Sequence, residues 1–126
     1  MAKSLFMLEP FTSHSGVRLD WKIDCDALTE AELECIAFII HNQFSRIKWV
    51  VGIPQGGVRL ANVLRSKYVC RHSKGITLIV DDVLTTGASM EKAREAHPGA
   101  SGAVIFARGP CPDWIQPVFQ MAIIVI

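Results

Sequence analysis

The fold of this chain is decided by residues 77–89, which read Thr77-Leu78-Ile79-Val80-Asp81-Asp82-Val83-Leu84-Thr85-Thr86-Gly87-Ala88-Ser89. A run of apolar β-forming residues stops at two adjacent acids, and hydroxyl residues around a glycine follow. We expect a buried strand over residues 76–80 and a helix that begins near Ala88. Because Gly87 permits a tight turn and a helix N-terminus offers free amides, the pattern predicts a strand that leads into a phosphate-binding loop.

Strands and helices alternate on both sides of this stretch. Thr29-Glu30-Ala31-Glu32 has the pattern of a capping box, so a helix is expected from there to about residue 44. Further helices are expected over residues 58–66 and from residue 88 to just before residue 97. Further strands are expected over residues 49–53, 68–70, 103–106 and 121–126.

The expected strands are continuous apolar runs, which is typical of parallel strands covered on both faces. We therefore predict an α/β fold with a mostly parallel central sheet and helices on both faces. At 126 residues the chain suits a single domain, residues 1–126. Residues 1–28 lack a helical period and are expected to form a small N-terminal segment, called the hood segment below.

Two polar stretches, residues 54–57 and 81–89, each follow an expected strand. Ligands of open parallel sheets bind beyond the carboxyl ends of the strands, so both stretches are expected to face one crevice. Asp81 and Asp82 would repel a phosphate unless they contact something else, such as sugar hydroxyls or a hydrated Mg²⁺. A phosphorylated ribose that carries a pyrophosphate would meet all of these requirements.

Residues 80–89 resemble the phosphoribosyl pyrophosphate (PRPP) motif of type I phosphoribosyltransferases. Three further segments resemble orotate phosphoribosyltransferase in the same order along the chain, as its N-terminal motif, its pyrophosphate loop and a late strand with a closing arginine. They are Phe11-Thr12-Ser13-His14-Ser15-Gly16, Val51-Gly52-Ile53-Pro54-Gln55-Gly56-Gly57-Val58 and Gly102-Ala103-Val104-Ile105-Phe106-Ala107-Arg108. The resemblance implies the phosphoribosyltransferase fold, with a hood over the crevice and a cis peptide between Pro54 and Gln55.

The resemblance also implies a role for each site residue. Asp81 and Asp82 are implied to be catalytic, near a Mg²⁺ that binds through PRPP. The implied ligands of the 5-phosphate are Val83, Leu84, Thr85, Thr86, Gly87, Ala88 and Ser89. The implied ligands of pyrophosphate are Pro54, Gln55, Gly56, Gly57, Arg71 and Lys74. The base is implied to contact Arg108 and His14.

Each of these assignments has a plainer alternative. The acids could be solvated at a strand end before a capped helix, and residues 54–57 could be an ordinary turn. Arg108 could be a solvated or salt-bridged strand-end arginine, residues 71–75 a surface turn, and His14 a surface histidine.

The chain departs from the orotate enzymes at the parts that stabilise the leaving group. Their long basic loop is reduced here to residues 71–75, Gly56 stands where they usually have lysine, and His14 replaces a lysine of the N-terminal motif. A closing loop supplies charge stabilisation and excludes water. We therefore expect PRPP binding to outlast efficient turnover.

The implied function is transfer of a phosphoribosyl group from PRPP to a nucleobase, a pyrimidine such as orotate, with release of pyrophosphate, by a homodimer. One alternative is a PRPP- or nucleotide-binding regulatory protein with lost or weak catalysis, and another is a structural oligomer that keeps only the fold. With 13 basic and 12 acidic residues, the charge indicates neither a nucleic-acid nor a membrane partner. Four scattered cysteines and no expected secretory signal favour the cytoplasm.

Overall fold

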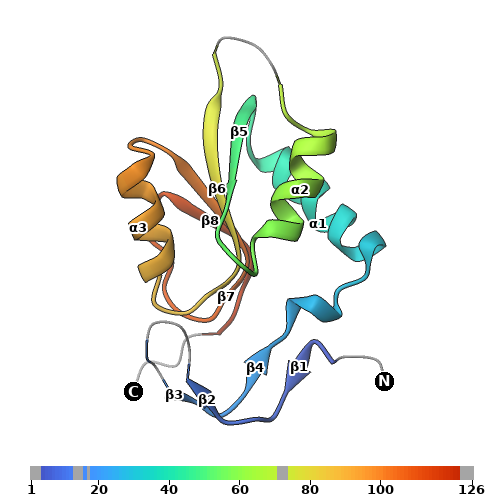
Figure 1. Cartoon of the computed structure of the whole chain (residues 1–126), viewed down its shortest axis with the longest axis vertical. Coiled ribbons are helices and arrows are strands. Elements are labelled where there is room, and N and C mark those ends of the chain that lie inside the picture. The colour runs from blue at the N-terminus through green and yellow to red at the C-terminus, as the bar shows by residue number, and fades with distance from the viewer. Residues whose placement is uncertain (1–3, 13–15, 17, 71–73, 123–126) are drawn as a thin grey trace.

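A four-stranded parallel sheet organises the chain in the computed structural model, which describes residues 4–12, 16, 18–70 and 74–122 (Figure 1). The strand order is β5-β6-β7-β8. The strands are β5 (Ile47–Gly52), β6 (Ile76–Leu84), β7 (Ser101–Ala107) and β8 (Ile115–Gln120). Helices α1 (Glu30–Gln43) and α2 (Val58–Lys67) cover one face, and α3 (Ala88–Ala96) covers the other. The predicted α/β class is confirmed.

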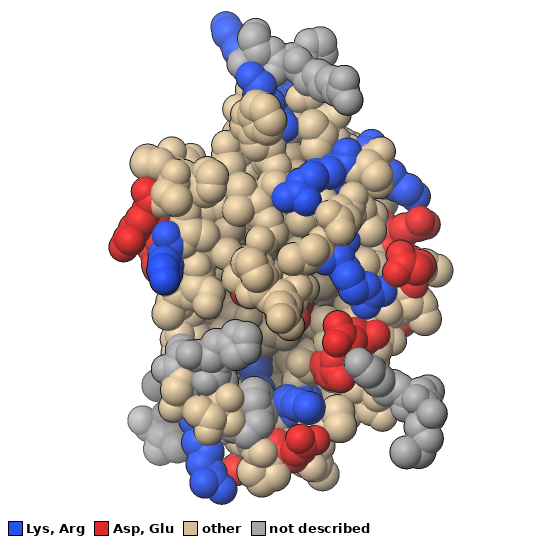
Figure 2. Space-filling view, viewed as in Figure 1, with Lys and Arg blue, Asp and Glu red and all other residues tan. Residues whose placement is uncertain are grey.

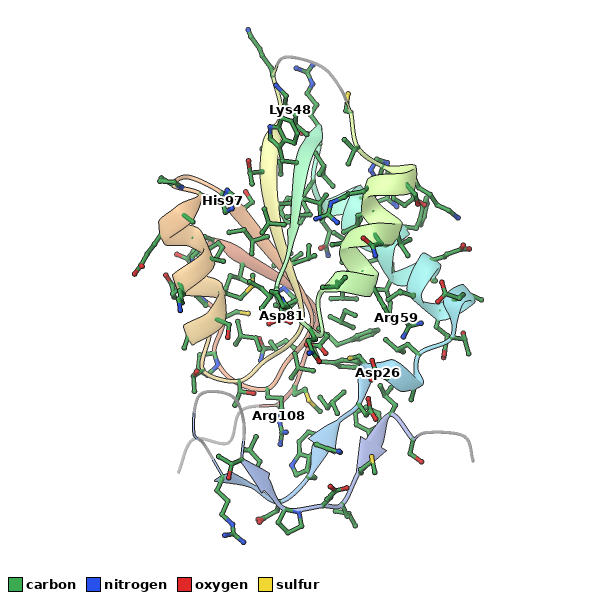
Figure 3. All side chains as sticks on the ribbon, viewed as in Figure 1. Asp26, Lys48, Arg59, Asp81, His97 and Arg108 are labelled. Atoms are coloured by element: carbon green, nitrogen blue, oxygen red, sulfur yellow. The ribbon has the colours of Figure 1, made fainter. Side chains whose placement is uncertain are left out.

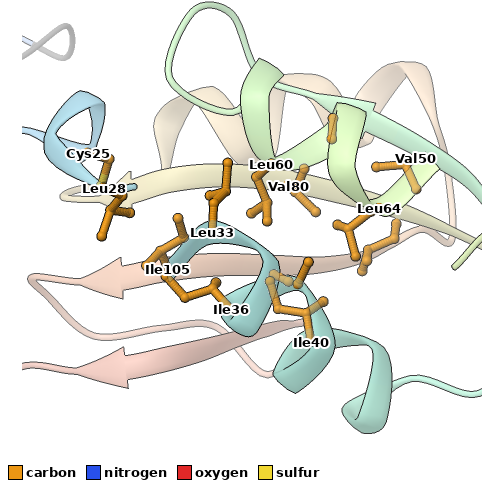
Figure 4. Close-up of a cluster of buried hydrophobic side chains, with 14 of the residues drawn as sticks. Cys25, Leu28, Leu33, Ile36, Ile40, Val50, Leu60, Leu64, Val80 and Ile105 are labelled. Atoms are coloured by element: carbon orange, nitrogen blue, oxygen red, sulfur yellow. The ribbon is translucent and has the colours of Figure 1, made fainter. Parts of the chain in front are cut away.

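Side-chain alternation along β6 explains why both faces are covered. Leu78 and Val80 belong to the apolar cluster that includes residues of α1 and α2, part of which is shown in Figure 4. Ile79 points the other way and belongs to a second cluster with Met90 of α3. Because successive side chains of a strand alternate between faces, a continuous apolar run needs a helical layer on each side.

Helix α1 begins at the capping box that the sequence predicts. The Thr29 hydroxyl accepts a hydrogen bond of 3.1 Å from the Glu32 amide, and the Glu32 carboxylate accepts one of 2.8 Å from the Thr29 amide. These two bonds satisfy amides that a helix start otherwise leaves unpaired. The capping box therefore fixes the point at which the chain leaves the hood segment.

The hood segment lies across the carboxyl ends of the parallel strands (Figure 1). Its strands pair antiparallel, β1 (Phe6–Met7) with β4 (Lys22–Ile23) and β2 (Phe11–Thr12) with β3 (Arg18–Leu19). A 3₁₀ helix, η1 (Cys25–Ala27), follows. Arg59 of α2 donates hydrogen bonds to the carbonyls of Cys25 (3.3 Å) and Leu28 (3.1 Å) and pairs with Glu30 (2.9 Å), so it ties this segment to the sheet-and-helix body.

Strand β5 forms one edge of the sheet, and a side chain covers part of that edge. The Arg65 guanidinium donates two hydrogen bonds, of 3.1 and 2.7 Å, to the Val50 carbonyl. The Cys70 amide donates to the Ile47 carbonyl at 2.7 Å. The sequence predicts a strand over residues 68–70, the segment that makes this hydrogen bond. That prediction is wrong, since these residues form a turn and coil.

Two other strand predictions need correction. Strand β6 continues four residues beyond Val80, because its ladder with β7 runs on to Leu84 after its ladder with β5 has ended. The last strand of the described residues is Ile115–Gln120, whereas the sequence predicts one over residues 121–126. Residues 121 and 122 are in no strand, and 123–126 lie outside the described residues. Pro117 obscures β8 in the sequence, but an edge strand tolerates proline.

None of the helices in the described part of the chain combines the length and hydropathy that crossing a membrane requires.

Candidate active site

A cavity of about 290 Å³ lies between the hood segment and the carboxyl ends of the strands. In Figure 2 a hollow is visible above the hood segment. Thr12 and Ile23 line the cavity from the hood segment, and Arg108 lines it from the end of β7. The remaining lining comes from residues 53–56 and 81–90. The structure therefore brings together the two polar stretches that the sequence places at strand ends.

Asp81 and Asp82 form a coupled pair inside strand β6. The Asp82 amide donates to the Asp81 carboxylate at 2.8 Å, and the Val83 amide donates to the Asp82 carboxylate at 2.7 Å. Burial, and then the hydrogen bond and charge of Asp82, raise the pKa of Asp81 to about 8. The raised pKa of Asp81 therefore favours its protonated form near neutral pH.

The segment from Thr85 to α3 has the geometry of an anion-binding loop. Gly87 adopts the left-handed conformation (φ 84°) and provides no capping side chain for the nine-residue helix α3. The amides of the first turn of α3 therefore have no strong acceptor among the described residues. The Thr86 hydroxyl accepts only a long hydrogen bond of 3.4 Å from the Ala88 amide. An uncapped helix N-terminus with hydroxyl neighbours attracts a phosphate.

Residues 54–57 form a tight loop between β5 and α2. The Pro54–Gln55 peptide is cis, as the resemblance implies. The Gly57 amide donates to the Ile53 carbonyl at 2.8 Å. A Cβ at Gly57 would collide with the Val80 carbonyl, so Gly57 supports the loop from behind and does not line the cavity. A Cβ at Gly56 would collide with the Asp82 carboxylate, which shows that this acid lies against the loop.

Arg108 joins the cavity to the hood segment. Its guanidinium lies 3.7 Å from the centroid of the Trp21 ring and donates a 2.8 Å hydrogen bond to the Trp21 carbonyl. Figure 3 shows Arg108 below Asp81, on the hood side of the strand ends. Burial lowers the pKa of Arg108. The sequence marks Arg108 but not its contact with Trp21, because residues far apart in the chain give no local signal of a shared site.

Among the predicted site residues that the structure describes, Gly57 and Lys74 do not line the cavity. Lys74 lies just before the amino end of β6, whereas the cavity is at the carboxyl end. The nine residues of β6 separate the two ends by about 25 Å at a rise of about 3.3 Å per residue. Arg71 and His14 lie outside the described residues.

The sequence also gives no hint that Cys25 of the hood segment lies near the acid pair. Burial, together with the charges of Asp82, Asp24 and Asp81, raises the pKa of the Cys25 thiol. Cys25 is therefore a neutral thiol at physiological pH, and it contributes an apolar wall beside the acids.

The architecture matches a known class of fold. No protein-family profile matches the sequence, and no curated protein does. Among solved structures, orotate phosphoribosyltransferase from Aeropyrum pernix is similar with a TM-score of 0.68 and 23% identity, over 92% of this chain and 88% of that chain. The chain therefore has the type I phosphoribosyltransferase fold.

Two further solved structures share this fold. The orotate phosphoribosyltransferase of Mycobacterium tuberculosis in complex with inorganic phosphate is similar with a TM-score of 0.65 and 17% identity, over 90% of this chain and 87% of that chain. The APRTase of Giardia lamblia complexed with 9-deazaadenine gives a TM-score of 0.62 and 18% identity, over 90% of this chain and 93% of that chain. The same fold thus occurs in proteins named for different bases.

Proposed function

We propose that this protein transfers a phosphoribosyl group from PRPP to a nucleobase and releases pyrophosphate. The observation that supports this most directly is the single cavity in which the Asp81–Asp82 pair, the uncapped N-terminus of α3 and the loop at Pro54 meet. The fold is that of phosphoribosyltransferases. A pyrimidine such as orotate is our proposed acceptor, on the resemblance of the N-terminal and late-strand motifs.

In this proposal the loop of residues 85–89 holds the 5-phosphate at the positive end of α3. Asp81 and Asp82 contact the ribose hydroxyls, and the negative charge of the pair favours the positive charge that develops at C1 as the bond to pyrophosphate breaks. Arg108, held by Trp21, faces the acceptor base from the hood side. The hood segment covers this end of the cavity and limits the access of water.

The acid pair also fits Mg²⁺, which prefers oxygen ligands and often binds through one or two carboxylates plus substrate phosphates. In the described residues no three His, Cys, Asp or Glu side chains gather as a metal site, so most ligands would have to come from PRPP itself. Bound in this way, Mg²⁺ would supply neutralising charge for the departing pyrophosphate. Asp81 and Asp82 are the residues that would orient it.

Steady-state assays with PRPP, Mg²⁺ and each of orotate, uracil and adenine test this function. We expect formation of the orotate nucleotide, slower than the roughly 10 per second of an ordinary enzyme. The double variant Thr86→Val, Ser89→Ala should weaken PRPP binding about tenfold, and Asp113→Asn, an exposed acid beyond the cavity lining, is the control. Absence of nucleotide with every base would contradict the proposal.

A second candidate is a PRPP- or nucleotide-binding regulatory protein with little catalysis. The observation that favours it is the lack of cations for the leaving group: among the described residues that line the cavity, Arg108 alone has a basic side chain, and it contacts Trp21. A thermal-shift assay separates the candidates. Stabilisation by about 2.7 kcal/mol at 100 times the dissociation constant, without turnover of any base, would favour this second function.

A further inference from the structure

The cavity has two proposed anion-binding parts, residues 54–57 and residues 85–89. The contact between Gly56 and Asp82 makes them differ in the charge that lies against them. A Cβ at Gly56 would collide with the carboxylate of Asp82, so the absence of a side chain at this position leaves the room that the carboxylate occupies. The Val83 amide holds the same carboxylate with a 2.7 Å hydrogen bond. A negative charge therefore lies against the loop that the sequence marks for pyrophosphate.

No basic side chain from residues 54–57 lines the cavity to balance that charge in the described structure, and the nearby Arg59 guanidinium is bonded to the Cys25 and Leu28 carbonyls and to Glu30. Residues 54–57 contain no basic side chain. Arg108, the one basic residue among the described lining residues, stacks on Trp21 at 3.7 Å on the hood side. Lys74 lies beyond the opposite end of β6. A diphosphate placed beside Gly56 would thus meet the Asp82 carboxylate without a basic side chain from the loop itself.

The loop before α3 differs in this respect. It offers the hydroxyls of Thr85, Thr86 and Ser89 and the first-turn amides of α3. The acid nearest in sequence is Glu91, and its carboxylate accepts a 2.8 Å hydrogen bond from the Trp114 indole, which holds it in an exposed contact outside the cavity lining. A single phosphate is therefore stabilised here by hydroxyls and amides, whereas a second anionic group at Gly56 would lie directly against the Asp82 carboxylate.

We infer that Asp82, held against Gly56, is a specificity-determining residue that makes the cavity favour ribose ligands with one phosphate over PRPP. This inference rests on the proposed function, which places the 5-phosphate at residues 85–89. Repulsion between like charges a few ångströms apart near a protein surface is worth at least about tenfold in affinity. A nucleoside 5′-monophosphate, the product of the proposed reaction, would consequently be retained and would compete with PRPP.

Calorimetric titration with ribose 5-phosphate and with PRPP tests the inference, because the two ligands differ only in the diphosphate at C1. Without divalent cations, the wild-type protein should bind ribose 5-phosphate at least about tenfold more tightly than PRPP. In Asp82→Asn, which keeps the shape of the side chain, the ratio of the two dissociation constants should approach one. Asp113→Asn removes an exposed acid outside the lining and should leave the ratio unchanged.

Gly56→Ala gives a second measurement that keeps the charge. The added Cβ meets the end of a side chain, so the Asp82 carboxylate can rotate away while the backbone stays in place. The ratio should fall in this variant also. Circular dichroism confirms that each variant is folded before it is titrated.

The outcomes distinguish this inference from the proposed function. Tighter binding of PRPP by the metal-free wild type, or an unchanged ratio in both Asp82→Asn and Gly56→Ala, would overturn the inference and leave the phosphoribosyltransferase proposal intact. Failure of both ligands to bind the wild-type protein, with or without Mg²⁺, would overturn the proposed function and this inference together.

Discussion

The side chain of Asp81 keeps a proton that an aspartate in water loses. Its pKa is raised to about 8 by burial and by Asp82, from about 3.9 in an unfolded chain. Between these values the folded chain holds more protons than the unfolded chain, so this residue makes the free energy of unfolding fall as the pH rises from about 4 to about 8.

Asp81→Asn should remove that dependence. We expect the melting temperature of the variant, relative to wild type, to be higher at pH 8 than at pH 5 by roughly 10 °C, since the linkage over this range corresponds to about 3 kcal/mol. Thermal unfolding followed by circular dichroism at the two pH values measures this difference. If the variant and the wild type differed in melting temperature by the same amount at pH 5 and at pH 8, Asp81 would ionise normally.

Substitution by alanine should destabilise the protein more at Gly57 than at the neighbouring Gly56. At Gly57 a Cβ would collide with the carbonyl oxygen of Val80 and come within 2.8 Å of the Ile53 amide, both backbone atoms that cannot rotate away. Gly57→Ala should therefore cost about 1–3 kcal/mol, the usual cost of overpacking. Gly56→Ala, for which the nearest atoms belong to the Asp82 carboxylate, should cost less. Urea denaturation of both variants provides the comparison, and equal costs would contradict it.

At the scale of elements, Arg59 links α2 to the hood segment. It binds two hood carbonyls and Glu30. Because hydrogen bonds from charged groups contribute about 1.5–3 kcal/mol each, and this side chain is partly exposed, Arg59→Met should destabilise the chain by about 1–2 kcal/mol. Amide exchange should quicken in β1 and β4 while the parallel sheet stays protected.

A matched control for Arg59 is Lys67→Met on the same helix. Lys67 pairs with Glu34 of α1 at 3.1 Å, in an exposed bridge that does not involve the hood segment. Exposed pairs contribute little, about 0–1 kcal/mol. If Lys67→Met quickened exchange in the hood segment as much as Arg59→Met did, the link described for Arg59 would be wrong.

The elements themselves were largely predictable from local patterns. The Thr29 capping box, the apolar run into Asp81 and the glycine before α3 each carry a local signal, and each matches the structure. Strand β8 was missed because Pro117 removes a donor that only an inner strand needs. The end of β6 was misplaced because pairing with β7, rather than hydropathy, decides where the strand stops.

The candidate site was predictable only in part, for a related reason. Strand ends signal which loops share the crevice, so the sequence indicates residues 54–57 and 81–89 together, and all of these except Gly57 line the cavity. The contact of Gly56 with Asp82 and the stack of Arg108 on Trp21 depend on tertiary packing, which no spacing in the sequence encodes. Those two contacts carry the arguments about specificity.

For the whole molecule we propose a homodimer. Large apolar side chains remain on the surface of the described structure, among them Trp49, which is 62% exposed. Exposed apolar side chains can contribute to an interface between copies of a chain. Light scattering at micromolar concentration should give about twice the mass of one chain, and a mass that stays at one chain over the whole concentration range would rule the dimer out.

The Arg65 side chain on the β5 edge has a consequence for the protein where other polypeptide chains are present at high concentration. An open strand edge is a template on which another polypeptide can polymerise, and crowded cells contain many candidates. By occupying the Val50 carbonyl from the side, the guanidinium removes one of the acceptors that an incoming strand would need, and it brings a positive charge to the same place. We therefore expect Arg65 to hinder the addition of a foreign strand at this edge, an effect that no measurement of ligand binding would register.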